Sequence, residues 1–141
     1  MKLLVGDSVT YPRYFTLEEA NGLLEWLRGQ LQGIAATREE LARLQPQMES
    51  LLRAARTNGH GETDARLGAT RRAIDSAAER MARAAQEVQD RGILLRDAQR
   101  GLVDFPALRE GREIFLCWLL GEGDVAYWHE TDAGFAGRQP L

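Results

Sequence analysis

Apolar residues recur at intervals of three and four along the first half of the chain, which is the spacing of a helix with one buried face. The series runs through Leu17, Ala20, Leu24, Leu27, Leu31 and Ile34, and after an interruption at Arg38 it resumes at Leu41, Leu44, Met48, Leu51 and Ala55. Thr16 and Glu19 form a capping box that marks the start of the helix. Pro46 lies inside the pattern, and we expect it to kink or break the helix.

A second series with the same spacing follows a loop at residues 57–61. Its members are Leu67, Thr70, Ile74, Ala77, Met81, Ala84 and Val88, and Gly92 is a natural stop for the helix. The two series predict an antiparallel helical hairpin over residues 16–91.

Charges on the two helices favour one register of this hairpin. If the hairpin turns near residue 60, opposite charges face each other at four pairs: Glu40 with Arg80, Arg43 with Glu79, Glu39 with Arg83, and Glu49 with Arg72. Arg38 opposite Arg83 is a like-charged exception. Exposed pairs of this kind contribute only about 0.2–1 kcal/mol each, so they indicate register and not stability.

After Gly92 the helical spacing ends, and short apolar runs alternate with turn-forming residues. The runs lie at residues 93–96, 102–105, 113–119 and 125–129, and the turns between them at 97–101, 106–111 and 121–124. This pattern predicts a small antiparallel meander. Residues 114–118 are apolar at every position, so we expect a central strand that is covered by helices.

The expected fold class is therefore α+β, with a long, coiled-coil-like antiparallel helical hairpin followed by a small antiparallel β-meander. We expect a single domain over residues 1–141. It consists of an N-terminal extension (1–12), the hairpin (16–91), the sheet (93–130) and a C-terminal tail (131–141).

Composition is that of an ordinary globular protein, with 44% hydrophobic and 28% charged residues among 141. The longest apolar run, residues 114–120, is far shorter than the roughly 20 residues of a membrane-spanning helix. The apolar stretch at residues 3–5 is too short for a signal peptide, and the single Cys117 cannot form an intramolecular disulfide. We therefore expect a cytoplasmic protein that does not associate with membranes.

The charge distribution argues against nucleic-acid binding. Seventeen of the 18 basic residues are arginines, yet no segment is strongly basic and the net charge is −3. Residues 101–141 carry three arginines against seven acidic residues, for a net charge of −4. This acidic third of the chain would repel phosphates and attract cations.

Five motifs carry a resemblance to a known family. They are RYFTLEEAN at residues 13–21, GLVDFPA at 101–107, CW at 117–118, YWHE at 127–130 and DAGFAGR at 132–138. Together they resemble an uncharacterised prokaryotic family, catalogued as domain of unknown function 2203. The resemblance spans residue 13 to the C-terminus and leaves residues 1–12 as an extension. It implies a helical hairpin with a C-terminal strand region, and it implies no activity.

Five polar residues of the acidic third are candidates for a ligand site: Asp104, His129, Glu130, Asp132 and Arg138. One histidine with three carboxylates can bind zinc, manganese or iron. His129 and Glu130 point to opposite faces of a strand, so His129 and Asp132 are the expected metal ligands if the chain turns after Glu130. The spacing matches no established ligand motif. The structural alternative is that Asp104 caps a turn before Pro106 and that His129 is a hydrogen-bonded histidine at the sheet edge.

Cys117 and Arg138 lead to two separate expectations. Cys117 could act as a nucleophile with His129, but it lies between Leu116 and Trp118 in an acidic region, so we expect it to be buried as packing. We expect the tail to fold back across the sheet, so that Arg138 forms an ion pair with Asp104, Glu130 or Asp132. That pair would either fasten the tail or bind an anionic ligand.

Two classes of function follow from these patterns. The leading hypothesis is a non-enzymatic interaction module that forms a homodimer through its helices, since two helices alone cannot cover the leucines near residues 41–52. The alternative is a small enzyme or divalent-metal-binding protein with its site near His129, Glu130 and Asp132. Nucleic-acid binding through the arginine-bearing helices is a third, weaker hypothesis. The sequence identifies no substrate, protein partner or cofactor apart from the divalent metal.

Overall fold

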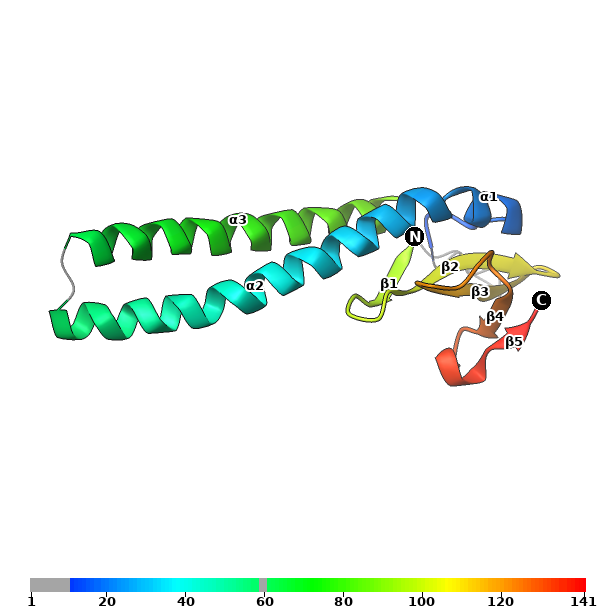
Figure 1. Cartoon of the computed structure of the whole chain (residues 1–141). Coiled ribbons are helices and arrows are strands. Elements are labelled where there is room, and N and C mark those ends of the chain that lie inside the picture. Colours follow the sequence, from blue (N-terminus) through cyan, green and yellow to red (C-terminus); the bar gives the residue numbers. More distant parts are fainter. Residues whose placement is uncertain (1–10, 59–60) are drawn as a thin grey trace. The chain divides into compact units, whose positions relative to one another are not determined.

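The computed structural model describes residues 11–58 and 61–141 (Figure 1). Two long helices pack together and are followed by a five-stranded antiparallel sheet, which confirms the predicted α+β class. The chain divides into two compact units, which we call the hairpin unit (Gln32–Ala84) and the sheet unit (Met1–Leu31 with Ala85–Leu141). Most of the predicted N-terminal extension, residues 1–10, lies outside the described residues. Among the described helices, none is long and apolar enough to cross a membrane.

The first predicted helix is two helices, α1 (Leu17–Gly22) and α2 (Leu24–Asn58). The capping box is present: the Thr16 hydroxyl accepts from the Glu19 amide at 3.0 Å, and the Glu19 carboxylate accepts from the Thr16 amide at 2.9 Å. Leu23 interrupts the helix because its N–H donates to the carbonyl oxygen of Ala20 at 3.1 Å, three residues back. The apolar spacing continues from Ala20 to Leu24 across this junction, so it does not indicate the break.

Pro46 does not break α2, which continues through it to Asn58. The proline removes one donor, so the carbonyl oxygen of Ala42 has no partner four residues ahead in the helix. Both Ala42 and Pro46 are exposed, and water can therefore satisfy that carbonyl oxygen. The expectation of a break is wrong for this reason.

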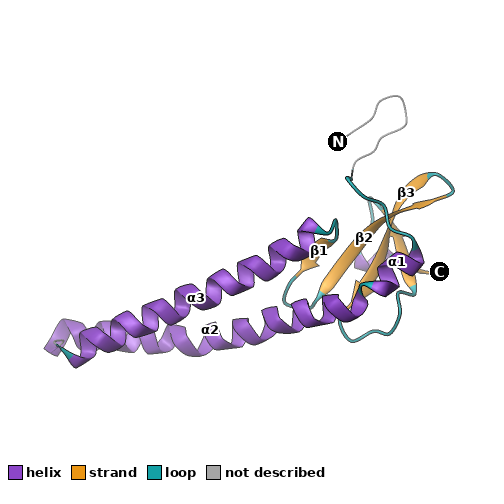
Figure 2. Cartoon of the chain, turned by 90° about the horizontal axis from the view of Figure 1, so that it is seen from above, coloured by secondary structure: helices purple, strands orange, loops and turns teal. Residues whose placement is uncertain are grey.

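The hairpin unit contains the facing parts of α2 and of α3 (Glu62–Asp90) (Figure 2). A guanidinium nitrogen of Arg80 lies 3.0 Å from the Glu40 carboxylate, which confirms one of the four predicted pairs. Glu79 approaches Arg83 of its own helix at 3.8 Å. The remaining three pairs stay predictions. The predicted stop is confirmed, since Gly92 adopts a φ of 86° just after α3 ends.

The sheet is a meander in which consecutive strands are neighbours. Its strands are β1 (Leu94–Asp97), β2 (Leu102–Arg109), β3 (Arg112–Leu119), β4 (Tyr127–Glu130) and β5 (Gln139–Pro140). The loop predicted at residues 121–124 does connect two strands, β3 and β4. The tail also contains a short helical turn, η1 (Phe135–Gly137), before β5 pairs with β4.

The turn predicted at residues 106–111 is wrong for most of its length. β2 continues through Pro106 to Arg109, and the turn consists of Glu110 and Gly111, both with positive φ. Proline is tolerated here because β1 pairs with β2 only up to Asp104, so the missing N–H of Pro106 lies beyond the end of β1 on an edge that no strand covers. The carbonyl oxygen of Pro106 accepts from the Phe15 amide at 2.7 Å.

Strand β3 is buried on both faces from Ile114 to Trp118, as predicted. On one face, the ring of Phe105 lies across the ring of Phe15 just before α1, at 5.2 Å. Among the described residues, no α-helix covers the other face, which corrects the prediction. Tyr11 packs there against Phe115 at 5.6 Å, and the tail lies on that side of the sheet while α1 lies on the other (Figure 1).

Candidate metal centre

Three neighbouring strands each contribute one ligand-bearing side chain to the face beneath the tail. They are Asp104 from β2, Cys117 from β3 and His129 from β4. Asp104 pairs with Cys117, and His129 pairs with Phe115, which lies two residues from Cys117 and so on the same face. One ligand atom of each residue lies within 4.8 Å of the others. All three residues are buried, with at most 3% of their surface exposed.

The hydrogen bonds of His129 fix the orientation of its ring. Nδ1 lies 2.8 Å from the backbone carbonyl oxygen of Glu130, and Nε2 lies 2.9 Å from Oδ1 of Asp104. A carbonyl oxygen only accepts, so Nδ1 carries a hydrogen and donates it. Nε2 then faces a carboxylate oxygen, and one proton must lie between them to make that contact favourable. A cation at this position can replace that proton.

Arg96 holds the carboxylate of Asp104 from the other side. Its Nε donates to Oδ2 at 2.9 Å, which leaves Oδ1 directed at His129. The guanidinium also lies 5.0 Å from the centre of the Phe115 ring, although 43% of the Arg96 side chain is exposed. The carboxylate is therefore oriented by two contacts before any ligand binds.

Cys117 is buried, as the sequence predicted, and its surroundings keep the thiol protonated. Burial and the charge of Asp104 raise the pKa of Cys117 to about 12. A free thiolate nucleophile at neutral pH is therefore excluded. Apolar neighbours on both sides of Cys117 gave no sign of a ligand. A usable signal was that Asp104, Cys117 and His129 each lie in one of three consecutive predicted strands.

A cavity of about 170 Å³ adjoins the three residues. Its remaining lining consists of Arg96 and Leu102 from the sheet and Ala133, Gly134 and Phe135 from the tail. The cluster therefore has one side that faces open space. The turn expected at Asp104 is wrong, since Asp104 lies within β2, and His129 is buried rather than at an exposed sheet edge.

Glu130 and Asp132 lie apart from this cluster. Glu130 forms an ion pair with Arg112 at 2.9 Å, and by strand alternation its side chain projects to the face opposite His129, as predicted. Asp132 is exposed and does not belong to the group of three. The structure thus brings His129 together with Asp104 and Cys117, and not with Asp132.

Arg138 has a different partner from the three acids expected. The tail folds back and pairs with β4, as predicted, but a guanidinium nitrogen of Arg138 lies 2.7 Å from Oε1 of Glu122. The guanidinium also stacks over Tyr127 at 4.1 Å and over Phe135 at 4.6 Å, and its side chain is only 10% exposed. Glu122 is available because the β3–β4 loop turns it back toward the end of β3, where it also accepts from the Leu119 amide at 2.8 Å.

These contacts predict that Glu122 fastens the tail. Burial alone would raise the pKa of Glu122, but the hydrogen bonds from Arg138 and the Leu119 amide outweigh it and lower the pKa. We expect Glu122→Gln to lower the free energy of unfolding by about 1–2 kcal/mol at pH 7. Urea unfolding of both proteins measures this difference.

The pH dependence of the Glu122→Gln effect has a definite sign. A carboxylate with a lowered pKa in the folded state stabilises the protein above its unfolded pKa, and this contribution disappears as the pH falls through the folded pKa. The difference between wild type and Glu122→Gln should therefore shrink in acid. Asp124→Asn removes an exposed carboxylate from the same loop and should change stability little. Equal losses for both variants would show that Glu122 has no special role.

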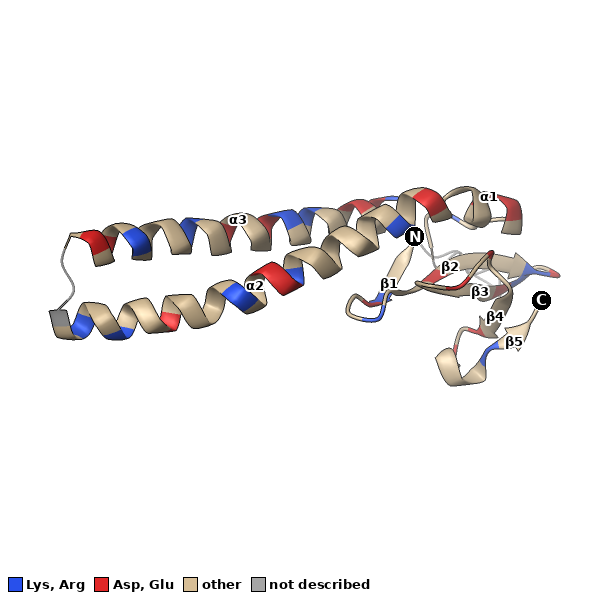
Figure 3. Cartoon of the chain, in the orientation of Figure 1, with Lys and Arg blue, Asp and Glu red and all other residues tan. Residues whose placement is uncertain are grey.

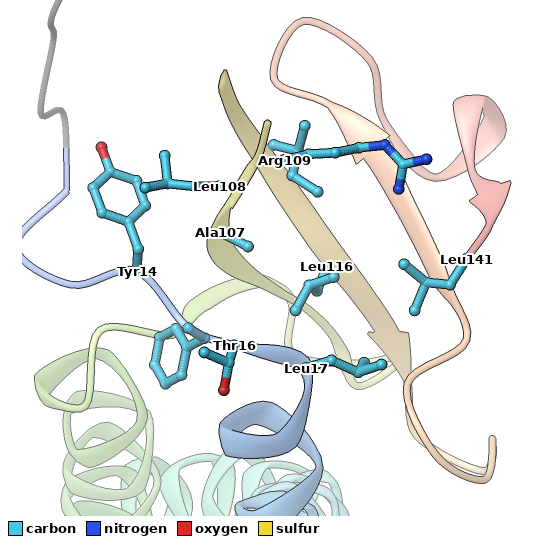
Figure 4. Close-up of a pocket in the computed structure, with 10 residues that line it drawn as sticks. Tyr14, Thr16, Leu17, Ala107, Leu108, Arg109, Leu116 and Leu141 are labelled. Carbon is cyan, nitrogen blue, oxygen red and sulfur yellow. The ribbon is translucent and has the colours of Figure 1, made fainter. Parts of the chain in front are cut away.

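A larger groove of about 470 Å³ lies on the helix-facing side of the sheet (Figure 4). The described residues that line it are Tyr14, Phe15, Thr16, Leu17, Ala107, Leu108, Arg109, Ile114, Leu116 and Leu141. None of them is a histidine, cysteine, aspartate or glutamate. The groove therefore offers an apolar surface but no metal-ligating group, and the smaller cavity is the better candidate for chemistry.

Comparison with known proteins gives one match. A family model described as "Uncharacterized conserved protein (DUF2203)" matches residues 13–141. No match was found among the curated proteins or the solved structures that were compared. The match begins at Arg13, which is also the first residue of the motif RYFTLEEAN.

Proposed function

The chain belongs to the DUF2203 family of uncharacterized conserved proteins, and we propose that it binds one divalent transition-metal ion through Asp104, Cys117 and His129. A carboxylate, a thiolate and an imidazole form a mixed oxygen, sulfur and nitrogen set. Zinc accepts all three ligand types, whereas magnesium and calcium prefer oxygen alone. Zinc is therefore the ion that this set fits best.

The orientation of His129 is the observation that carries this proposal. A metal-ligating histidine usually donates its second ring N–H to a backbone carbonyl or a carboxylate, and this contact fixes the ring. His129 makes such a contact from Nδ1 to the Glu130 carbonyl oxygen at 2.8 Å and directs Nε2 at Oδ1 of Asp104 at 2.9 Å. Arg96 orients the Asp104 carboxylate in a comparable way. The imidazole and the carboxylate are therefore both oriented toward the position that the metal ion would occupy.

The spacing of the ligand atoms is close to what a metal requires. Around a tetrahedral zinc ion with bonds of about 2.0–2.3 Å, ligand atoms lie about 3.3–3.8 Å apart. Nε2 and Oδ1 are 2.9 Å apart, and no pair in the group exceeds 4.8 Å. Small side-chain rotations are sufficient to reach the required spacing. The ion would also stabilise the Cys117 thiolate, which is otherwise unfavourable at this buried position.

A competition titration tests the proposal. Metal-free protein is titrated with zinc in the presence of a chromophoric chelator, and we expect one zinc ion per chain. His129→Ala and Cys117→Ser should each weaken binding by at least about 100-fold, because each removes a ligand. Circular dichroism establishes that the variants remain folded.

Asp132→Asn is the matched control for this titration. It also removes a potential ligand from the C-terminal third, but its side chain is exposed and lies outside the group of three. We expect it to bind zinc as the wild type does. Zinc affinity that is unchanged by His129→Ala, or that is lost only in Asp132→Asn, would contradict the proposed site.

The hairpin unit supports a second function, homodimerisation. Only Ile34, Thr37, Leu51 and Ala77 are buried among its described residues, while Leu41, Leu44 and Met48 stay half-buried and Leu52 is 40% exposed. Basic and acidic residues are interspersed along both helices (Figure 3). A surface with apolar stripes and mixed charges complements a second copy of itself better than it complements a polyanion such as nucleic acid.

Analytical ultracentrifugation at micromolar concentration tests this second function. We expect a mass of two chains for the wild type and a shift toward the monomer for Leu44→Glu combined with Leu52→Glu. Leu108→Glu introduces the same charge at an exposed leucine of the sheet unit and should leave the mass unchanged. A monomeric wild type would rule out dimerisation while leaving the metal site unaffected.

A further inference from the structure

The three protein ligands leave one coordination position that faces the 170 Å³ cavity. A tetrahedral zinc site with four protein ligands is closed and structural, whereas a site with three keeps a position for water or for another ligand. Asp104, Cys117 and His129 all line the cavity. A metal held by them would therefore present its fourth position to that space.

The charges around the site favour an anion at the fourth position. A divalent metal is neutralised by the Asp104 carboxylate and the Cys117 thiolate, while His129 binds as a neutral ring. The guanidinium of Arg96, 2.9 Å from Asp104, then leaves a net charge of +1. Arg138 adds nothing because Glu122 balances it at 2.7 Å. One negative charge at the fourth position makes the whole site neutral.

The size and lining of the cavity restrict the anion further. A volume of about 170 Å³ is well below the roughly 300–1,000 Å³ of sites that hold drug-sized ligands. Beyond the ligands and Arg96, the walls are the apolar side chains of Leu102, Ala133 and Phe135 together with the backbone of Gly134. A small anion with a short apolar group fits this combination of one charged end and an apolar wall.

On this basis we propose that the bound metal accepts a carboxylate oxygen of a small monocarboxylic acid from the cavity, an inference that rests on the proposed metal site. Arg96 stabilises the anion through its charge, and the Ala133–Phe135 segment of the tail provides the apolar wall. Acetate is the simplest member of this class. Carboxylates much larger than the cavity, such as cholate, should bind more weakly than acetate because they do not fit within about 170 Å³.

Cobalt substitution separates this inference from the proposed metal site. Cobalt(II) bound to a thiolate gives a charge-transfer band, and its visible d–d bands respond to a change in the fourth ligand. The full chain is loaded with cobalt and titrated with acetate, with perchlorate at equal ionic strength as the non-coordinating control. We expect a thiolate band on loading and a saturable change in the d–d bands with acetate alone.

Each outcome of this experiment has one meaning. If the thiolate band does not form, the metal site itself is wrong. If the band forms but acetate changes nothing beyond perchlorate, the metal site stands and the anion inference is overturned. A response to cholate as strong as that to acetate would overturn the proposed size limit.

Two variants of Arg96 test the role of its charge. Arg96→Gln keeps a donor for Asp104 but removes the positive charge, and we expect the dissociation constant for acetate to rise about tenfold, which corresponds to about 1.4 kcal/mol. Arg96→Lys keeps the charge and should bind acetate nearly as the wild type does. Equal acetate affinity in Arg96→Gln and the wild type would show that the charge of Arg96 does not select the ligand.

Discussion

Replacing Trp118 with alanine is expected to lower the free energy of unfolding by about 3–5 kcal/mol, the usual cost of truncating a large core side chain. Trp118 is fully buried in the central strand β3. Its indole Nε1 donates to the carbonyl oxygen of Gly123 at 2.8 Å, so the substitution also leaves this carbonyl oxygen without its donor. Urea unfolding followed by circular dichroism measures the loss.

Trp118→Phe separates packing from hydrogen bonding at the same position. Phenylalanine keeps most of the buried ring but cannot donate to Gly123, and we expect it to cost about 1–2 kcal/mol. A loss of less than about 1 kcal/mol for Trp118→Ala would mean that β3 is not the centre of the core. The described sheet would then be wrong.

Removing Asp104 from the metal-free protein should cost about 2–5 kcal/mol, since it removes one acceptor shared by two donors and each group left unsatisfied costs about 1–3 kcal/mol. The side chains of Asp104 and His129 are only 4% and 3% exposed. Asp104→Ala deprives His129 Nε2 and Arg96 Nε of their common acceptor. Urea unfolding in the presence of a chelator measures the effect without any metal.

The double variant Asp104→Leu, His129→Phe tests whether the two residues act as a pair. It replaces both polar groups with apolar ones of similar size, and such replacements are often neutral or stabilising. We expect it to be more stable than Asp104→Ala by at least about 2 kcal/mol. A double variant as unstable as the sum of both single losses would show that Asp104 and His129 contribute independently.

The helices could be predicted because their signals are local. The capping box at Thr16, the spacing of apolar residues and the stop at Gly92 each depend on residues within one or two turns. The break at Leu23 and the continuity of α2 through Pro46 could not be predicted in the same way. Both depend on which backbone groups are exposed to water or find another partner, and the sequence pattern does not contain that information.

The predicted end of β2 at residue 105 was wrong for a related reason. Proline and glycine at residues 106–111 are strong turn signals, but a proline on a free strand edge breaks no hydrogen bond. Whether Pro106 lies on an edge depends on where β1 ends. β1 has four residues and β2 has eight, so the second half of β2 extends beyond β1. A local turn signal cannot report the length of a neighbouring strand.

The candidate site could be predicted in part. Asp104 and His129 were identified from residue type, and the structure brings them into contact at 2.9 Å. Cys117 was assigned only to packing because its neighbours in sequence are apolar, although it is both buried and a potential ligand. Arg138 was expected to pair with an acid near His129, but the loop between β3 and β4 places Glu122 within 2.7 Å of its guanidinium. The partner of Arg138 therefore depends on the conformation of this loop, which the sequence pattern does not contain.

The most direct test of the metal site is a crystal structure of the zinc-loaded protein with data collected on both sides of the zinc absorption edge. The account predicts one anomalous peak per chain, about 2.0–2.3 Å from Nε2 of His129, an Asp104 carboxylate oxygen and Sγ of Cys117. It also predicts that Nδ1 of His129 still donates to the Glu130 carbonyl oxygen. Zinc bound elsewhere, with the direct contact between Asp104 and His129 intact and no peak among the three residues, would contradict it.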